Sequence, residues 1–205
     1  MKFFSYISRS NISYSNQITL TRLLGSVTVL PVLVIYILPY NNWLANSFVA
    51  IAFAGLAFTD FLDGYIARKY KEVSLIGEIL DPIADKFLLF AGLVSLLAIQ
   101  KISFWWVFIL LGREIFIMTL RHIAAEYYCS IPVIVIAKYK TTMQLLSLFF
   151  IILNPYMYES ILKHPYWNGT TYGMLVLATG LSILSAYYYA QFFIDRMKCY
   201  LKTGD

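Results

Sequence analysis

The sequence is poor in charged residues, which make up 13% of its 205 positions. Soluble domains carry about twice that fraction, so this chain has too few polar side chains to cover a water-soluble globule of its length. Hydrophobic residues reach 60%, and the mean hydropathy is +0.69. The composition therefore excludes most soluble classes of protein and indicates that much of the chain faces lipid.

Cysteine and histidine are also scarce, with two residues of each. Cys129 and Cys199 do not form a C-x-x-C pair, and no histidine stands near them at the spacing of metal ligands. We therefore expect two unpaired thiols with no redox role. The net charge of +5 is not gathered into the basic face of a nucleic-acid-binding protein.

Long apolar runs, by contrast, recur along the whole chain. A helix that spans a membrane needs about 20 mostly apolar residues, and six segments meet this need: 20–39, 44–67, 76–99, 103–125, 133–153 and 171–194. We predict an all-α integral membrane protein in which residues 19–196 form one domain of six transmembrane helices. Residues 1–18 are expected to form a short interfacial helix, residues 197–205 a cytoplasmic tail, and residues 154–171 the longest loop.

The distribution of Lys and Arg predicts how these helices are oriented. With the N-terminus inside, the two outer loops hold only Lys101 and Lys163, whereas the inner flanks hold nine cations: Lys2, Arg9, Arg22, Arg68, Lys69, Lys71, Arg196, Lys198 and Lys202. Because positive charge favours the cytoplasmic side of a membrane, we expect both termini in the cytoplasm and the chain in the inner (cytoplasmic) membrane.

Four of the six aspartates lie within 26 residues of one another, at Asp60, Asp63, Asp81 and Asp85. The first two are three residues apart and the last two are four apart, so each pair shares one face of its helix. A short basic turn separates the two predicted helices, which makes them antiparallel neighbours. The four carboxylates are therefore expected to converge near the cytoplasmic ends of these helices.

Converging carboxylates in a membrane need a counter-ion, because each charged aspartate is costly there and like charges repel strongly at low dielectric. Oxygen ligands suit Mg²⁺, Mn²⁺ or Ca²⁺ and not zinc, and four carboxylates can hold the two ions that clamp a transferring phosphoryl group. Two alternatives stay open. The aspartates could pair with nearby cations (Arg68, Lys69, Lys71 and Lys86), or they could line the ion path of a transporter.

Small residues stand one helical turn from three of the aspartates, at Gly64, Ala67 and Gly77. Their lack of bulk lets a flat ligand approach the helix backbone, although close helix packing in membranes favours the same residues. Arg68 follows at the end of this face and could hold a phosphate through its fork geometry.

These residues together read Asp60-x-x-Asp63-Gly64-x-x-Ala67-Arg68, then eight residues, then Gly77-x-x-x-Asp81-x-x-x-Asp85. The pattern resembles the signature of the CDP-alcohol phosphatidyltransferases. The resemblance implies a six-helix fold, a homodimer and two Mg²⁺ or Mn²⁺ ions on the four aspartates. It also implies that Asp85 acts as general base and that a cytidine diphosphate site is lined by Asp63, Gly64, Ala67, Arg68 and Gly77.

Four cations in or near the later apolar segments suggest an anionic acceptor. Arg113 and Arg121 are two turns apart on one face of the fourth segment, and Lys138 and Lys140 open the fifth. Such side chains can surround a phosphate monoester without metal. Alternatively, they only balance the aspartates or extend to the membrane surface.

Three stretches are similar to one branch of the family, the phosphatidylglycerophosphate synthases: Gly112-Arg113-Glu114-Ile115, Lys138-x-Lys140-Thr141-x-x-Gln144, and the opening from Asn16 through Thr19 to Arg22, where Ser15 replaces the usual proline. The similarity implies contacts from Asn16, Thr19 or Arg22 to the nucleotide or the acceptor, and we assign Asn16 and Thr19 to the cytidine diphosphate site. It also implies transfer of a phosphatidyl group from CDP-diacylglycerol to sn-glycerol 3-phosphate in the bilayer, with Arg113, Arg121, Lys138 and Lys140 on the acceptor phosphate. Other acceptors (inositol phosphate, serine or phosphatidylglycerol) and a divalent-cation transporter remain alternatives.

Overall fold

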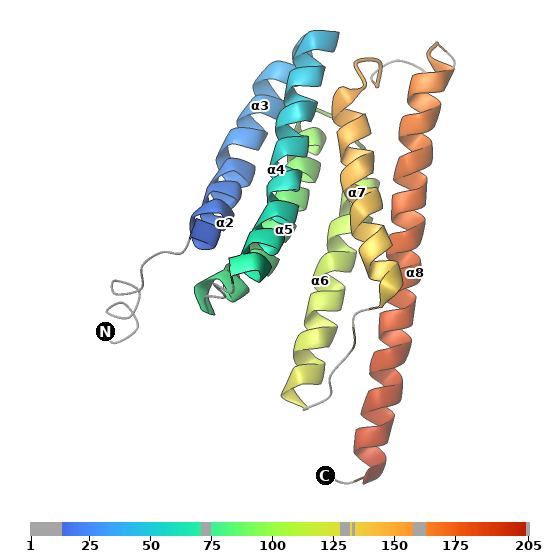
Figure 1. Ribbon diagram of the computed structural model, residues 1–205. Coiled ribbons are helices and arrows are strands. Elements are labelled where there is room, and N and C mark those ends of the chain that lie inside the picture. Colours follow the sequence, from blue (N-terminus) through green and yellow to red (C-terminus); the bar gives the residue numbers. More distant parts are fainter. Residues whose placement is uncertain (1–13, 71–74, 128–131, 133, 158–162, 204–205) are drawn as a thin grey trace.

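The computed structural model describes residues 14–70, 75–127, 132, 134–157 and 163–203. All of the regular structure in these residues is helical, and the helices run side by side in one bundle (Figure 1). The elements are α2 (Tyr14–Leu24), η1 (Gly25–Val29), α3 (Leu30–Ile37), η2 (Leu38–Tyr40), α4 (Trp43–Tyr70), α5 (Leu75–Ala98), α6 (Phe104–Glu126), α7 (Val135–Leu153) and α8 (Pro165–Thr203). The all-α prediction is confirmed for this part of the chain.

The first four elements form one continuous helical rod. Its middle turn, η1, is a π-helix, in which the N–H of Leu30 donates to the carbonyl of Gly25. Pro31 follows directly. It cannot donate a backbone hydrogen bond. A single π-turn inside a longer α-helix is the usual form in which π-helix occurs. Gly25 also lets the rod approach α4 closely, because a Cβ there would lie 2.9 Å from Leu56 Cδ2.

Local signals explain where several of the helices begin and end. The Asn42 side chain accepts a hydrogen bond of 3.1 Å from the N–H of Leu44 and so caps the start of α4. At the end of α5, Gln100 adopts a left-handed conformation (φ 57°). The N–H groups of Gln100 and Lys101 then donate to the carbonyls of Leu97 and Leu96, which is the hydrogen-bond pattern of a Schellman motif.

Each of the six apolar segments lies almost entirely within one helical rod. Three helical stretches among the described residues are long and apolar enough to cross a membrane: Thr19–Tyr40, Val135–Leu153 and Pro165–Lys198. Large apolar side chains such as Tyr36, Trp105 and Phe108 are exposed on the outside of the bundle. These features are those of a membrane protein, whereas the number of crossings and the side of the termini stay predictions.

One boundary prediction was wrong. We expected a loop over residues 154–171, but α8 already begins at Pro165. Proline is favoured at the first position of a helix, because its missing N–H has no intrahelical partner there and its φ angle is already helical. The polar residues after it, including Asn168 and Thr171, are buried in the first turns of α8. They had been interpreted as loop residues because they interrupt the apolar pattern.

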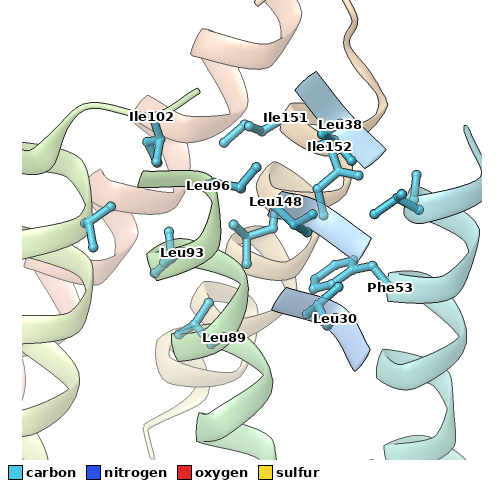
Figure 2. Close-up of a cluster of buried hydrophobic side chains, with 14 of the residues drawn as sticks. Leu30, Leu38, Phe53, Leu89, Leu93, Leu96, Ile102, Leu148, Ile151 and Ile152 are labelled. Atoms are coloured by element: carbon cyan, nitrogen blue, oxygen red, sulfur yellow. The ribbon is translucent and has the colours of Figure 1, made fainter. Parts of the chain in front are cut away.

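The main apolar core occupies one end of the bundle. It joins side chains from α3, α4, α5, α6, α7 and α8 and reaches Ile102 and Met157 in the two connections at that end. Figure 2 shows Leu30, Phe53 and Leu148 directed toward one another within it. Three of the four buried charged side chains that the structure describes, Arg22, Arg113 and Lys140, lie beyond this core. The bundle is thus apolar toward one end and polar toward the other.

Candidate active site

The aspartates lie on two successive antiparallel helices. Asp60 and Asp63 are in the C-terminal part of α4, and Asp81 and Asp85 are in the N-terminal part of α5. Figure 1 shows that α5 runs back beside α4, so both pairs are at the same end of the bundle. The side chains of the four aspartates lie outside those that the structure describes, as do those of Asn16, Gly64, Ala67, Arg68 and Gly77.

The chemistry of this donor set suits a hard divalent cation. Four carboxylates offer only oxygen ligands, which Mg²⁺ and Mn²⁺ prefer. Among the side chains that the structure does describe, no three or more His, Cys, Asp or Glu residues come together as a metal site. The α4–α5 pair therefore remains the candidate metal centre.

Helix α2 brings two buried polar side chains toward this centre. Thr19 and Arg22 are three residues apart and are almost completely buried, and α2 packs against both α4 and α5. A buried arginine needs anionic or polar partners. Thr19 and Arg22 share one face of α2, and the contact of Thr19 with the nucleotide stays a prediction.

A cavity of about 830 Å³ opens at the same end of the bundle, between α5, α6, α7 and α8. All four residues expected to bind the acceptor phosphate line it: Arg113 and Arg121 from α6, and Lys138 and Lys140 from α7. Lys86 of α5, which directly follows Asp85, adds a fifth cation. Arg113 and Lys140 are buried in the wall, whereas Arg121 and Lys138 are exposed.

The two buried cations of this cavity share one carboxylate. Arg113 Nη1 lies 3.1 Å from Glu114 Oε1, and the Lys140 ammonium forms an ion pair with the same oxygen. Arg113 Nη2 donates a hydrogen bond of 2.7 Å to the Ser185 hydroxyl of α8, and its guanidinium carbon lies 5.9 Å from the centre of the Tyr189 ring. The wall of the cavity is thus an ordered network of charged and polar groups.

Comparison with known proteins identifies the family of the chain. The family model of the CDP-alcohol phosphatidyltransferases matches residues 12–185, which is most of the chain. The chain belongs to the CDP-alcohol phosphatidyltransferase family. Members of this family use divalent metal ions, as the four aspartates predict. The match also continues through much of α8, beyond residue 145, where the resemblance seen in the sequence motifs ends.

Individual relatives within the family carry one name, CDP-diacylglycerol–glycerol-3-phosphate 3-phosphatidyltransferase. The chain is similar to the protein of that name from Rickettsia felis, with 38% identity over 67% of the chain and 74% of the relative. It is also similar to those from Pseudomonas fluorescens, with 34% identity over 85% and 86%, and Cereibacter sphaeroides, with 33% identity over 67% and 62%.

Sequence reasoning missed several side chains at the cavity of this family member. Lys86 had been considered only as a partner for the aspartates, yet its ammonium contacts Met118 Sδ at 3.0 Å and lines the cavity. Glu114 lay inside a quoted motif without a role. Ser185 and Tyr189 gave no signal, because they stand in an apolar helix whose pattern indicates only a membrane span.

Proposed function

We propose that the protein transfers the phosphatidyl group of CDP-diacylglycerol to sn-glycerol 3-phosphate, giving phosphatidylglycerol phosphate and CMP. One observation carries the choice of acceptor. Five cationic side chains line a single cavity at the end of the bundle where α4 and α5 carry the aspartates. Such a cavity suits a small phosphate-bearing acceptor. The names of the relatives from Rickettsia felis and Pseudomonas fluorescens support the same assignment.

In this proposal, the two halves of the site have different tasks. Asp60, Asp63, Asp81 and Asp85 hold two Mg²⁺ or Mn²⁺ ions, which when bound neutralise charge on the pyrophosphate and on the departing CMP. Asp63, Gly64, Ala67, Arg68 and Gly77 bind the cytidine diphosphate, together with Asn16 and Thr19. The phosphate of the acceptor is bound by Arg113, Arg121, Lys138 and Lys140. Lys86 adds to the positive electrostatic potential of the cavity.

The chemical step follows from this placement. The primary hydroxyl of the acceptor attacks the phosphorus that carries the diacylglycerol, and Asp85 takes the hydroxyl proton. The bond from that phosphorus to the bridging oxygen breaks, and CMP leaves with the electron pair. Holding the acceptor phosphate fixes the hydroxyl in line with the breaking bond, which lowers the entropic part of the barrier.

The membrane setting completes the proposal. Six spans with both termini in the cytoplasm place the site at the cytoplasmic surface of the inner membrane, where a water-soluble acceptor meets a lipid donor. We further propose that the protein acts as a homodimer, as the family resemblance implies.

A single assay tests the function. Purified protein receives CDP-diacylglycerol and Mg²⁺, one of four acceptors, and CMP release is followed. We expect release with sn-glycerol 3-phosphate and little with serine, inositol phosphate or phosphatidylglycerol. Turnover with another of these acceptors would replace the proposed one. Metal flux into liposomes without any dependence on CDP-lipid would instead identify a transporter.

A further inference from the structure

Among the described residues, Glu114 is the one acidic side chain in the wall of the cation-lined cavity. Among the described residues that line the cavity there are five Lys and Arg side chains and this single carboxylate. A carboxylate in the wall of a cavity that binds a phosphate dianion repels the ligand and so lowers the affinity. The position of Glu114 therefore calls for a structural reason.

The contacts of Glu114 supply that reason. Its Oε1 atom bonds both Arg113 and Lys140, whose side chains are 7% and 4% exposed. Two buried cations so close together would repel each other and would lack a counter-charge in the empty site. The shared carboxylate offsets both effects and fixes the two cations around one point.

The same contacts join three helices. Both α6 and α7 pack mainly against α8, and the pair between Glu114 and Lys140 connects α6 to α7 directly. Arg113 ties α6 to Ser185 of α8. The N–H of Ile134, just before α7, donates to the hydroxyl of Tyr189 of α8 at 3.3 Å. Together with these contacts, Glu114 links α6, α7 and α8 through polar side chains around the cavity.

We propose that Glu114 is a positioning residue that ties α6 to α7 and so sets the spacing of the cations that receive the acceptor phosphate. The proposal rests on the function proposed above. In the ligand-free protein the carboxylate keeps Arg113 and Lys140 close together. Because Arg121 is on the same helix as Arg113 and Lys138 on the same helix as Lys140, the distance between Arg121 and Lys138 is set by the same contact. The acceptor then meets a preorganised site and does not have to draw the two helices together itself.

Steady-state kinetics tests the role in acceptor binding. Glu114→Gln removes the charge and keeps the shape, so we expect the KM for the acceptor to rise about tenfold or more, while the KM for CDP-diacylglycerol stays within about twofold. Because Glu114 acts through Lys140, the double variant Glu114→Gln/Lys140→Met should raise the acceptor KM by much less than the product of the two single effects. Glu126→Gln, on the same helix with its exposed carboxylate 3.6 Å from exposed His122, should leave both KM values unchanged.

A distance measurement tests the tie between the helices without any substrate. Nitroxide labels on Thr119→Cys of α6 and Tyr139→Cys of α7, both exposed positions, are placed in a background with Cys129→Ser and Cys199→Ser. Pulsed electron paramagnetic resonance should give a narrow distance distribution that becomes broader or longer with Glu114→Gln. Glu126→Gln should leave the distribution unchanged. If Glu114→Gln does not fold, Glu114→Asp replaces it, because it keeps the charge on a shorter side chain. We then expect a smaller change in the label distances and a smaller rise in the acceptor KM.

The outcomes separate this proposal from the proposed function. An unchanged distance distribution together with an unchanged acceptor KM overturns the positioning role. A lower acceptor KM also overturns it, because Glu114 would then compete with the acceptor. Equal losses for both substrates, with a lower melting temperature, reduce Glu114 to a purely structural residue. If wild-type protein does not use sn-glycerol 3-phosphate, the proposed function fails, and the label distances still decide whether Glu114 ties the helices.

Discussion

Lys101 is a single residue whose surroundings change its acid–base behaviour. It follows the left-handed turn at Gln100, between the predicted spans 76–99 and 103–125, and its side chain is turned back into the end of the bundle. Its ammonium reaches the Ile152 carbonyl at 3.4 Å. Burial lowers the pKa of Lys101 from 10.5 to about 7, because the charged form loses its hydration.

This shift makes stability depend on pH. Between pH 7 and 10.5 the unfolded chain binds more protons at Lys101 than the folded chain, so the free energy of unfolding should rise with pH by at most about 1.4 kcal/mol per pH unit. Lys101→Met should raise the melting temperature at pH 7 and remove this rise. Thermal unfolding in detergent from pH 7 to 10 measures both effects, with Lys163→Met, an exposed lysine of the connection between α7 and α8, as the control. An equal slope in Lys101→Met and wild type would contradict the assignment.

Asp85 carries the most specific chemical role in the proposed mechanism. Asp85→Asn removes the group that takes the proton from the acceptor, so CMP release should fall by about a hundredfold or more, the usual range for the loss of a general base. Binding of the CDP-lipid should weaken far less, because three aspartates remain. Single-turnover CMP release and equilibrium binding of the CDP-lipid separate the two effects. Turnover close to that of wild type would exclude Asp85 as the base.

The site residues divide according to what a sequence pattern can reveal. Arg113, Arg121, Lys138 and Lys140 could be predicted together, because charges in apolar segments are costly and so indicate function. The structure brings all four to one cavity. Ser185 could not be predicted, because it is 72 residues from Arg113 in sequence and serine is common in membrane helices. Contacts of this kind depend on helix packing, which no local pattern encodes.

At the scale of elements, the apolar periods predicted every helical rod but not every boundary. The start of α8 was placed too late, because polar residues in its first turns looked like a loop. In the structure these residues form a buried network: Asn154 Nδ2 donates to Asn168 Oδ1 at 2.8 Å and to Thr171 Oγ1 at 3.2 Å, and Asn154 Oδ1 accepts from the Tyr156 N–H. The network fixes the end of α7 against the start of α8.

This network gives a prediction for the α7–α8 connection. Asn154→Ala removes three hydrogen bonds of this network, to Asn168, Thr171 and the Tyr156 N–H, so the free energy of unfolding should fall by about 2–4 kcal/mol. The KM values should not change, because the network lies at the end of the bundle away from the cation-lined cavity. The melting temperature in detergent and the two KM values are the measurements. Thr170→Ala, an exposed residue whose hydroxyl bonds only within its own helix, should be neutral. A loss of activity without a loss of stability would contradict this assignment.

At the scale of the whole molecule, function follows from an uneven distribution of polarity along the bundle. The apolar core stabilises the end that holds Ile102 and Met157. The other end contains the starts of α2, α5 and α7 and the ends of α4 and α6 (Figure 1). Because successive helices alternate in direction, segments that are far apart in sequence meet there. The same alternation is the reason why the order of the apolar runs predicts that the aspartates and the later cations share one end of the bundle, whereas the membrane surface at which that end lies stays a prediction.

The orientation of the molecule in the membrane can be tested on α8 alone. Its 39 residues extend about 58 Å at 1.5 Å per residue, which exceeds the hydrocarbon core of about 30 Å, so Lys163 and Lys198 should lie on opposite sides. In a background with Cys129→Ser and Cys199→Ser, a membrane-impermeant maleimide should label Lys163→Cys in intact spheroplasts and Lys198→Cys only after permeabilisation. The reverse pattern would put the termini outside, and equal labelling of both in intact spheroplasts would mean that α8 does not cross. Either result would also contradict the cytoplasmic location proposed for the site. The ends of α4 to α7 that carry the aspartates and the cavity cations lie toward the Lys198 end of α8, so the site must be on the same side of the membrane as Lys198.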